Sequence, residues 1–340
     1  MADVKEPLYD FPVRDDRVVD LHVVTVRVRT NVPNAPAFRY FSRYASSVRG
    51  EALVSADYEL NCIDLDHDAV DLSAVSGRVD ATLRAKLFRT GYYLVHRFGD
   101  PAHLITVGRS FYVFGTHLER IVWPYFIKHI LTINAADHGF LHLKAAAFAD
   151  GDNCTLLVGA NGGGKTVFLA QACAEGSSFV SNTHTMIRDG LAYAVPTAIR
   201  IRNDGVFGPL IASRGLSQHM EDGDYLVTAE ALFGRPTRDL SRVRNLIIAD
   251  YQPGKPRGLE GVNKEDAAAF VRQFGLALTV YGLRDDLFEH HQRDFHRYTA
   301  TLHETERQLR DLTGSVRCFR ANVDMTDKRE RSAVMNALST

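Results

Sequence analysis

A glycine-rich segment at residues 159–166 constrains this chain more than any other part of its sequence. It reads Gly-Ala-Asn-Gly-Gly-Gly-Lys-Thr and matches the P-loop pattern G-x-x-x-x-G-K-[ST]. In such a loop the glycines let successive backbone N–H groups turn toward a phosphate, the lysine reaches the β- and γ-phosphates, and the hydroxyl binds Mg²⁺. Because consecutive glycines make folding entropically costly, we expect them to serve a ligand rather than a simple turn.

The residues on either side of the loop supply the strand and the helix that a P-loop requires. Residues 154–158 form a short apolar run typical of a buried strand, and residues 167–175 carry apolar side chains at helical spacing. We therefore predict that the chain binds ATP, although the loop itself does not distinguish ATP from GTP. The predicted nucleotide-binding residues are Gly159, Asn161, Gly162, Gly163, Gly164, Lys165, Thr166 and Val167.

Length and composition limit the remaining interpretations. The chain has 340 residues, of which 45% are hydrophobic, and this is enough for two domains with sizeable cores. Its formal net charge of −1 predicts no general attraction to nucleic acid or to an anionic membrane. The four cysteines include no C-x-x-C pair, and no apolar run reaches the roughly 18 residues of a membrane span. Since the charged N-terminus also lacks the apolar core of a signal peptide, we expect a cytoplasmic protein.

The pattern of apolar residues predicts two domains and a tail. A β-rich N-terminal domain covers residues 1–125, a nucleotide-binding domain covers residues 126–330, and a polar tail at residues 331–340 is expected to fray. The boundary falls in the interval 117–135, which includes an apolar segment that suits a helix at 118–133. The predicted strands are residues 18–29, 52–65, 91–98, 104–107, 111–115, 140–148, 179–180, 192–195, 198–201 and 246–249, and the further helices are residues 264–281 and 287–312.

An apolar strand ending in an acid, Leu246-Ile-Ile-Ala-Asp250, offers a second contact to Mg²⁺. The alternative is an ordinary buried strand that ends in a polar residue, because such runs are common in α/β domains. No segment resembles an ABC signature or the base-reading N-K-x-D of GTPases, which disfavours transporter and GTPase functions.

Two further groups of polar residues suggest ligand sites. Arg200 and Arg202 alternate with isoleucines, which places both guanidinium groups on one face of a strand, where they could meet a phosphate or an acidic acceptor. The segment 288–296 holds three histidines and two acids on a predicted helix. Its spacing does not reproduce H-E-x-x-H, so a solvated helix face is the better interpretation.

Residues 140–202 resemble the C-terminal catalytic domain of HPr kinase/phosphorylase. The resemblance lies in a strand with His142 before the P-loop strand, a short strand ending at residues 179–184, and an Arg-bearing strand after Pro196. It implies a fold of the α/β (α+β) class, in which the β-rich domain is followed by a phosphoenolpyruvate-carboxykinase-like P-loop kinase domain with a mixed sheet. It also implies a kinase that uses ATP and Mg²⁺ and often assembles into a homo-oligomer.

One departure from the family affects the expected chemistry. Where the family has two successive aspartates, this chain has Asn182 and Thr183. Asn182, together with Thr166, can still bind Mg²⁺ or a water on it, but neither Asn nor Thr accepts a proton at neutral pH. The candidates for the missing base are His142, His184, Asp189 and Asp250. Each has a structural alternative: strand histidines are often core residues, and Asp189 precedes a glycine as turn residues do.

These observations predict an ATP-dependent kinase that moves the γ-phosphate to a hydroxyl of a small molecule, a peptide serine or a carrier protein. Lys165 would neutralise the transferring group, while His142, with Asn182 or His184, would address the acceptor. Because the transition state of phosphoryl transfer is loose, positioning and charge neutralisation alone could also suffice. Two alternatives remain open: a regulatory ATP-binding protein that transfers no phosphate, and a simple NTPase.

Overall fold

The computed structural model divides the chain into two compact units, Met1–Ile130 and Leu131–Thr340. The division lies within helix α2 (Lys128–His138) and inside the interval expected from the sequence. The structure describes residues 10–33, 45–47, 55–68, 79–82, 85–88, 91–94, 102–118, 122, 127–160, 162–216, 223–275, 287–288 and 290–339. Asn161 and the end of the predicted helix 264–281 therefore lie outside the described residues.

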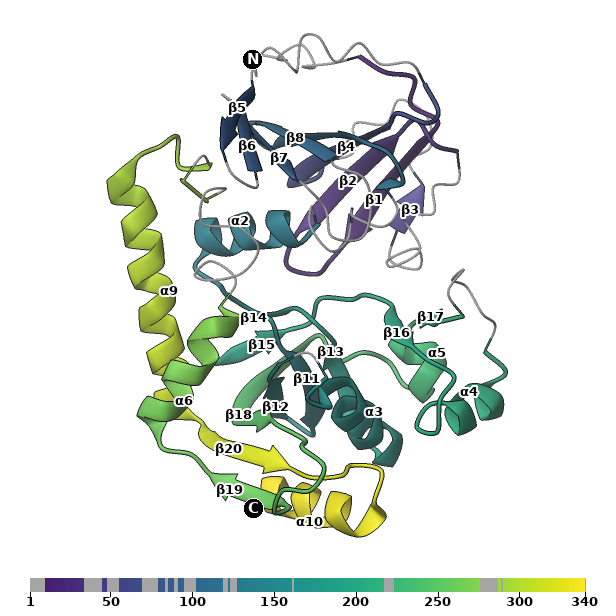
Figure 1. The fold of residues 1–340 in the computed structure, drawn as a ribbon, viewed down its shortest axis with the longest axis vertical. Coiled ribbons are helices and arrows are strands. Elements are labelled where there is room, and N and C mark those ends of the chain that lie inside the picture. Colours follow the sequence, from purple (N-terminus) through teal and green to yellow (C-terminus); the bar gives the residue numbers. More distant parts are fainter. Residues whose placement is uncertain are drawn as a thin grey trace. The chain divides into compact units, whose positions relative to one another are not determined.

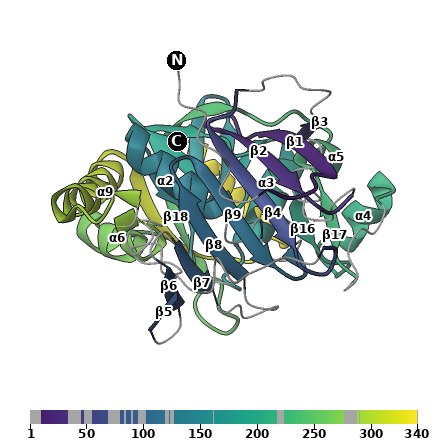
Figure 2. The same ribbon diagram turned by 90° about the horizontal axis from the view of Figure 1, so that it is seen from above.

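The first unit is built on a mixed sheet whose order is β3-β1-β2-β4-β9-β8-β7-β6-β5 (Figure 2). Its central strands alternate between buried and partly exposed side chains, as in β2, where Val26 and Val28 are fully buried. The pairs β2–β4 and β4–β9 are parallel, and the other neighbours are antiparallel. The strands are β1 (Asp15–Asp20), β2 (Thr25–Thr30), β3 (Ala45–Ser47), β4 (Tyr58–Asp64), β5 (Val79–Thr82), β6 (Ala85–Phe88), β7 (Gly91–Leu94), β8 (Ala102–Val107) and β9 (Ser110–Gly115).

The second unit also contains a mixed sheet, with the order β10-β14-β15-β18-β12-β11-β13 (Figure 1). Its strands are β10 (Leu141–Leu143), β11 (Ala146–Asp150), β12 (Asn153–Val158), β13 (Ser178–Ser181), β14 (Thr185–Arg188), β15 (Leu191–Tyr193) and β18 (Leu240–Ala249). Strand β20 (Arg317–Asn322) pairs with β18 and with β19 (Gly258–Gly261), while β16 (Ile199–Ile201) and β17 (Tyr225–Val227) pair apart from this sheet. The contacts β12–β18 and β18–β20 are parallel, so these three strands end at the same edge. The chain is thus a mixed α/β protein with mixed sheets.

Helices cover both faces of the second sheet. On one face, Leu156 and Val158 of β12 share a core with α6 (Lys264–Val271) and α9 (Phe295–Ser315). On the other face, Leu157 shares a core with α3 (Lys165–Glu175) and α10 (Lys328–Ser339). Figure 1 shows α9 and α3 on opposite sides of β12. Because alternate residues of a strand face opposite sides of the sheet, the uninterrupted apolar run at 154–158 contributes side chains to both cores. In the part of the second unit that the structure describes, the further helices are α4 (Gly208–Arg214), α5 (Ala229–Phe233) and a 3₁₀ turn at Arg272–Phe274.

A chain of polar contacts crosses the three parallel strands, from the buried Thr155 and Asn245 to the exposed Arg317. The amide nitrogen of Asn245 donates to the Thr155 hydroxyl at 3.1 Å, and its amide oxygen accepts from Arg317 at 2.9 Å. Arg317 also donates to the Leu338 carbonyl at 2.6 Å, near the end of α10. These bonds satisfy polar groups that burial would otherwise leave without partners, and they tie α10 to the strand that precedes the P-loop.

Several predicted elements have different bounds in the structure. The run 140–148 is two strands, β10 and β11, separated by Lys144 and Ala145. The run 18–29 is a hairpin that turns at His22, and the helix expected from residue 287 is regular only from Phe295, after a turn at Gln292 and Arg293. These three turn residues have positive φ angles, which side-chain periodicity does not reveal.

The tail at residues 331–340 is the clearest correction. These residues form most of α10, and Val334 and Leu338 are buried in the core below α3. The polar composition of the segment hid an amphipathic helix with apolar residues four positions apart. The short strands β14, β17, β19 and β20 were also not expected from the sequence.

Candidate nucleotide site

The P-loop joins β12 to α3 and lies against the end of β18. Gly162 and Gly164 have φ angles of 85° and 86°, which favour glycine. Gly163 approaches β18 so closely that a Cβ atom would lie 2.7 Å from the carbonyl oxygen of Ala249, and Gly159 approaches the same oxygen. Glycine is therefore required at these positions, by backbone conformation at two of them and by close contact at the other two.

Lys165, the first residue of α3, folds back over the loop. Its ammonium group donates to the carbonyl oxygens of Gly159 and Ala160, each at 2.8 Å. Burial and, to a smaller extent, the positive charge of Lys144 together lower the pKa of Lys165 to about 8. A bound anion near this ammonium group would restore the stability of its charged form.

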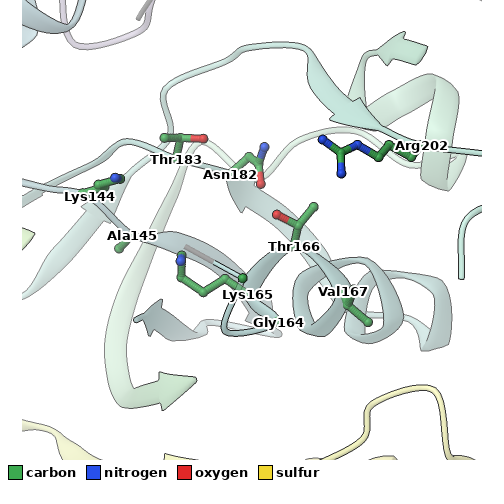
Figure 3. A pocket seen from close by; sticks show the side chains of 10 residues that line it. Lys144, Ala145, Gly164, Lys165, Thr166, Val167, Asn182, Thr183 and Arg202 are labelled. Atoms are coloured by element: carbon green, nitrogen blue, oxygen red, sulfur yellow. The ribbon is translucent and has the colours of Figure 1, made fainter. Parts of the chain in front are cut away.

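A cavity of about 430 Å³ opens at the loop (Figure 3). Three cationic side chains line it, from Lys144, Lys165 and Arg202, and the described lining contains no carboxylate and no imidazole. Such a lining favours a polyanion. The lining residues are Lys144, Ala145, Gly162, Gly164, Lys165, Thr166, Val167, Asn182, Thr183 and Arg202.

The two residues expected to bind metal meet in this cavity. Figure 3 shows the hydroxyl oxygen of Thr166 and the amide oxygen of Asn182 pointing toward each other. The amide oxygen of Asn182 is buried and accepts no hydrogen bond from the described residues. A hydroxyl and an orphaned amide oxygen fit Mg²⁺, which takes oxygen ligands and keeps several waters beside its phosphate ligands.

The two histidines proposed as bases lie side by side in the interior of the second unit. His142 Nε2 and His184 Nδ1 are 2.9 Å apart, and His142 Nδ1 lies 3.0 Å from the Thr132 hydroxyl. Each histidine is only 2% exposed, and neither is among the residues that line the cavity. His184 directly follows Thr183, which lines the cavity.

The remaining acids considered as bases lie outside the cavity lining. Asp250 follows β18, where its N–H donates to the Ala321 carbonyl at 3.0 Å and its carboxylate accepts from Gln252 at 2.6 Å. Asp189 sits in the turn between β14 and β15 with a φ angle of 54°. Asp250 thus directly follows the strand that pairs with the P-loop strand, whereas Asp189 is a turn residue.

Arg200 of β16 and Arg202, which directly follows the strand, reach the same partner, as their alternation predicts. Both guanidinium groups pair with Asp224, Arg202 through a 3.5 Å contact, and the Asp224 side chain is only 7% exposed. Arg202 lines the cavity, whereas Arg200 does not. The buried carboxylate of Asp224 thus lies within ion-pair distance of the arginine that lines the cavity.

Lys144 was missed by the sequence analysis. It stands alone as a charged residue in the apolar run 140–148, between β10 and β11. This isolation was a usable signal, since a charge is costly in a buried strand unless the chain places it at a polar site.

The histidine-rich segment 288–296 does not gather around an ion. His290 lies 2.9 Å from the carboxylate of Asp137, and His291 lies 2.9 Å from the Thr301 hydroxyl. Within the described part of the chain, no three histidine, cysteine, aspartate or glutamate side chains are grouped to hold a metal. Among the same residues, no helix has the length and apolar character needed to cross a membrane.

Comparison of the sequence with protein-family models gives no match, and comparison with curated proteins gives none.

Proposed function

We propose that this protein is an ATP-dependent phosphotransferase with an HPr-kinase-like, phosphoenolpyruvate-carboxykinase-like P-loop domain. One observation carries the proposal: the strand–loop–helix of β12 and α3, held against parallel β18, opens into a cavity that presents Lys165 and Thr166. A glycine loop, a lysine and a hydroxyl at this spacing are the parts that bind a nucleoside triphosphate.

The chain's own groups define how the nucleotide would be held. The N–H groups of the loop and of the first turn of α3 surround the β-phosphate, and Lys165 contacts the β- and γ-phosphates after leaving the loop carbonyls. A bound Mg²⁺ would neutralise negative charge on the phosphate oxygens. Thr166 and Asn182 would hold it, with Asp250 acting through water from the adjacent strand.

The acceptor would enter from the side of the cavity that Thr183 and Arg202 line. A hydroxyl there attacks the γ-phosphorus, its new O–P bond forms as the bond to the β–γ bridging oxygen breaks, and ADP leaves. The hydroxyl proton passes to solvent or to a base. With a loose transition state the proton leaves late, so Lys165 and the loop provide most of the stabilisation. His142 and His184 would act by holding the cavity wall.

A second candidate is a nucleotide-binding protein that regulates a partner without transferring phosphate. The observation that favours it is the described cavity lining, which offers no proton acceptor, together with the burial of the histidine pair. A third outcome, hydrolysis without any acceptor, would make the protein a simple NTPase.

The test uses γ-labelled ATP with Mg²⁺ and pools of serine peptides and of hydroxylated metabolites. We expect label transfer by the full chain and its loss in Lys165→Ala, while Lys328→Ala, which removes an exposed lysine at the start of α10, keeps it. Saturable ATP binding without transfer or hydrolysis would select the regulatory candidate. Phosphate release at the same rate with and without acceptors would identify the protein as an NTPase. Absence of ATP binding would refute the kinase, the regulatory protein and the NTPase alike.

A further inference from the structure

The two-stranded ribbon of β16 and β17 carries Arg202 to the cavity. Ile199 and Ile201 of β16 are almost fully buried and share a core with Phe168 of α3, the helix that follows the P-loop. Arg202 comes directly after this strand and is exposed. The apolar side of the ribbon is therefore packed in the same core as the P-loop helix, and the residue at its end lines the cavity.

The guanidinium group of Arg202 has N–H donors to offer inside the cavity. Its closest charged neighbour is the carboxylate of Asp224, 3.5 Å from Nε, a separation that suits an ion pair but is too long for a strong hydrogen bond. The Arg202 side chain is 76% exposed and donates no hydrogen bond to any residue that the structure describes. Asp224 thus compensates part of the charge without using the planar fork of donors, which fits a carboxylate or a phosphate.

Arg202 lies away from the half of the cavity that suits the nucleotide phosphates. Figure 3 shows Lys144 and Arg202 at opposite ends of the cavity, with Asn182 between them and the Arg202 guanidinium pointing toward Asn182. Lys165 and the loop glycines would hold the phosphates, and Thr166 with Asn182 would hold Mg²⁺. The end that Arg202 lines is therefore open to the acceptor.

We propose that Arg202 binds an anionic group of the acceptor, so that the substrate is a small hydroxylated acid, an inference that rests on the phosphotransfer proposed above. A guanidinium forms two parallel hydrogen bonds with a carboxylate or a phosphate, whereas a neutral alcohol accepts fewer and weaker ones. The hydroxyl and the anionic group must lie few bonds apart, because both occupy one cavity of about 430 Å³ together with the γ-phosphate.

The anionic group takes no part in bond making. The acceptor hydroxyl oxygen forms the new bond to the γ-phosphorus, the bond to the β–γ bridging oxygen breaks, ADP leaves, and the hydroxyl proton passes to solvent or to a base. Arg202 holds the acceptor by its other end and so fixes the distance from the hydroxyl to the phosphorus.

The test compares acceptors that differ only in the anionic group, with γ-labelled ATP and Mg²⁺. Glycerate is paired with glyceramide, 3-hydroxypropanoate with its amide, and glycerol 3-phosphate with glycerol, which separates carboxylate from phosphate recognition. Serine peptides with blocked termini form a further arm, and the pool of hydroxylated metabolites is divided into acids and neutral compounds. The Kd of the β,γ-imido analogue of ATP is measured separately by calorimetry.

We expect kcat/KM to be at least about tenfold higher for the acid of the preferred pair than for its neutral partner. Arg202→Met should bring this ratio to near one by raising the KM for the acid, while the Kd of the ATP analogue stays within about twofold. Arg202→Lys should keep part of the preference, because it keeps the charge but loses the fork. Arg329→Met, which removes an exposed arginine of α10, should change neither quantity.

An acid preference that is unchanged in Arg202→Met would overturn the proposal, as would equal use of acids and neutral compounds by the unmodified chain. Weaker binding of the ATP analogue to Arg202→Met would assign this arginine to the nucleotide instead. Transfer to the serine peptides alone would identify a protein acceptor and exclude the small acid. If the chain binds ATP but labels no acceptor, the proposed phosphotransfer fails, and the role of Arg202 fails with it. Thermal unfolding of Arg202→Met and the unmodified chain shows that the variant is folded.

Discussion

At the scale of single residues, the close approach of Gly163 to β18 restricts which side chain the P-loop can carry at this position. A Cβ atom at this position would lie 2.7 Å from the Ala249 carbonyl oxygen, and Ala249 is held in place by the pairing of β18 with β20. We expect Gly163→Ala to destabilise the protein by about 1–3 kcal/mol and to weaken nucleotide binding, because the loop must shift. Chemical denaturation and calorimetry measure the two effects.

Gly258→Ala is the matched control for this substitution, since a Cβ at Gly258 in β19 meets nothing within 4 Å. It should leave nucleotide affinity unchanged. Equal losses in the two variants would mean that the contact with Ala249 does not determine the loop's position.

The pKa of Lys165 predicts how nucleotide affinity depends on pH. The free protein loses the Lys165 charge as the pH rises through about 8, while a bound phosphate raises that pKa and keeps the charge. Binding above this pH must therefore take up a proton, and the affinity should fall between about pH 7.5 and 9.5. Calorimetry in buffers of different ionisation enthalpy measures the proton uptake. Lys165→Met should bind weakly and without this pH dependence; a persisting decline would assign it to another group.

At the scale of elements, α10 shows how a short amphipathic helix completes a core. Leu338 is 7% exposed and packs in the cluster that includes Phe168 of α3. Truncation to alanine leaves a cavity there, and we expect Leu338→Ala to lower the free energy of unfolding by about 2–4 kcal/mol. Asn336→Ala, on the exposed face of the same helix, should stay within about 0.5 kcal/mol. Denaturant titration of both variants checks this, and similar values would show that α10 is not held by its apolar face.

Local sequence patterns predict an element well when all the residues that define it are neighbours in the sequence. The P-loop, its strand and its helix were predicted because residues 154–175 carry the whole signal. The division of residues 140–148 was missed, since the bend at Lys144 is fixed by Phe274, more than a hundred residues away. The meeting of Lys144, Asn182 and Arg202 likewise depends on strand order, which a single sequence does not encode locally.

At the scale of the whole molecule, the division into two units predicts which part of the chain a bound nucleotide stabilises. All lining residues of the cavity belong to Leu131–Thr340. A ligand present at about 100 times its Kd stabilises the unit that binds it by about 2.7 kcal/mol. Hydrogen exchange should therefore slow in β12, β18 and β20 on addition of ATP, while β1, β2 and β4 keep their rates. Equal slowing in both units would show that binding stabilises the chain as a whole.

The contacts that join Thr155, Asn245, Arg317 and Leu338 link the P-loop strand to the last two elements of the chain, β20 and α10. These two elements are therefore needed while the chain is being synthesised. Strand β20 and helix α10 emerge from the ribosome after every other element of the second sheet, yet β20 covers the half of β18 that holds Leu246, Ile247 and Ile248. Until then, this apolar strand has an unpaired edge, which is the kind of segment that recruits other chains into aggregates. Chains truncated before residue 317 should accordingly be insoluble, and adding ATP should not make them soluble.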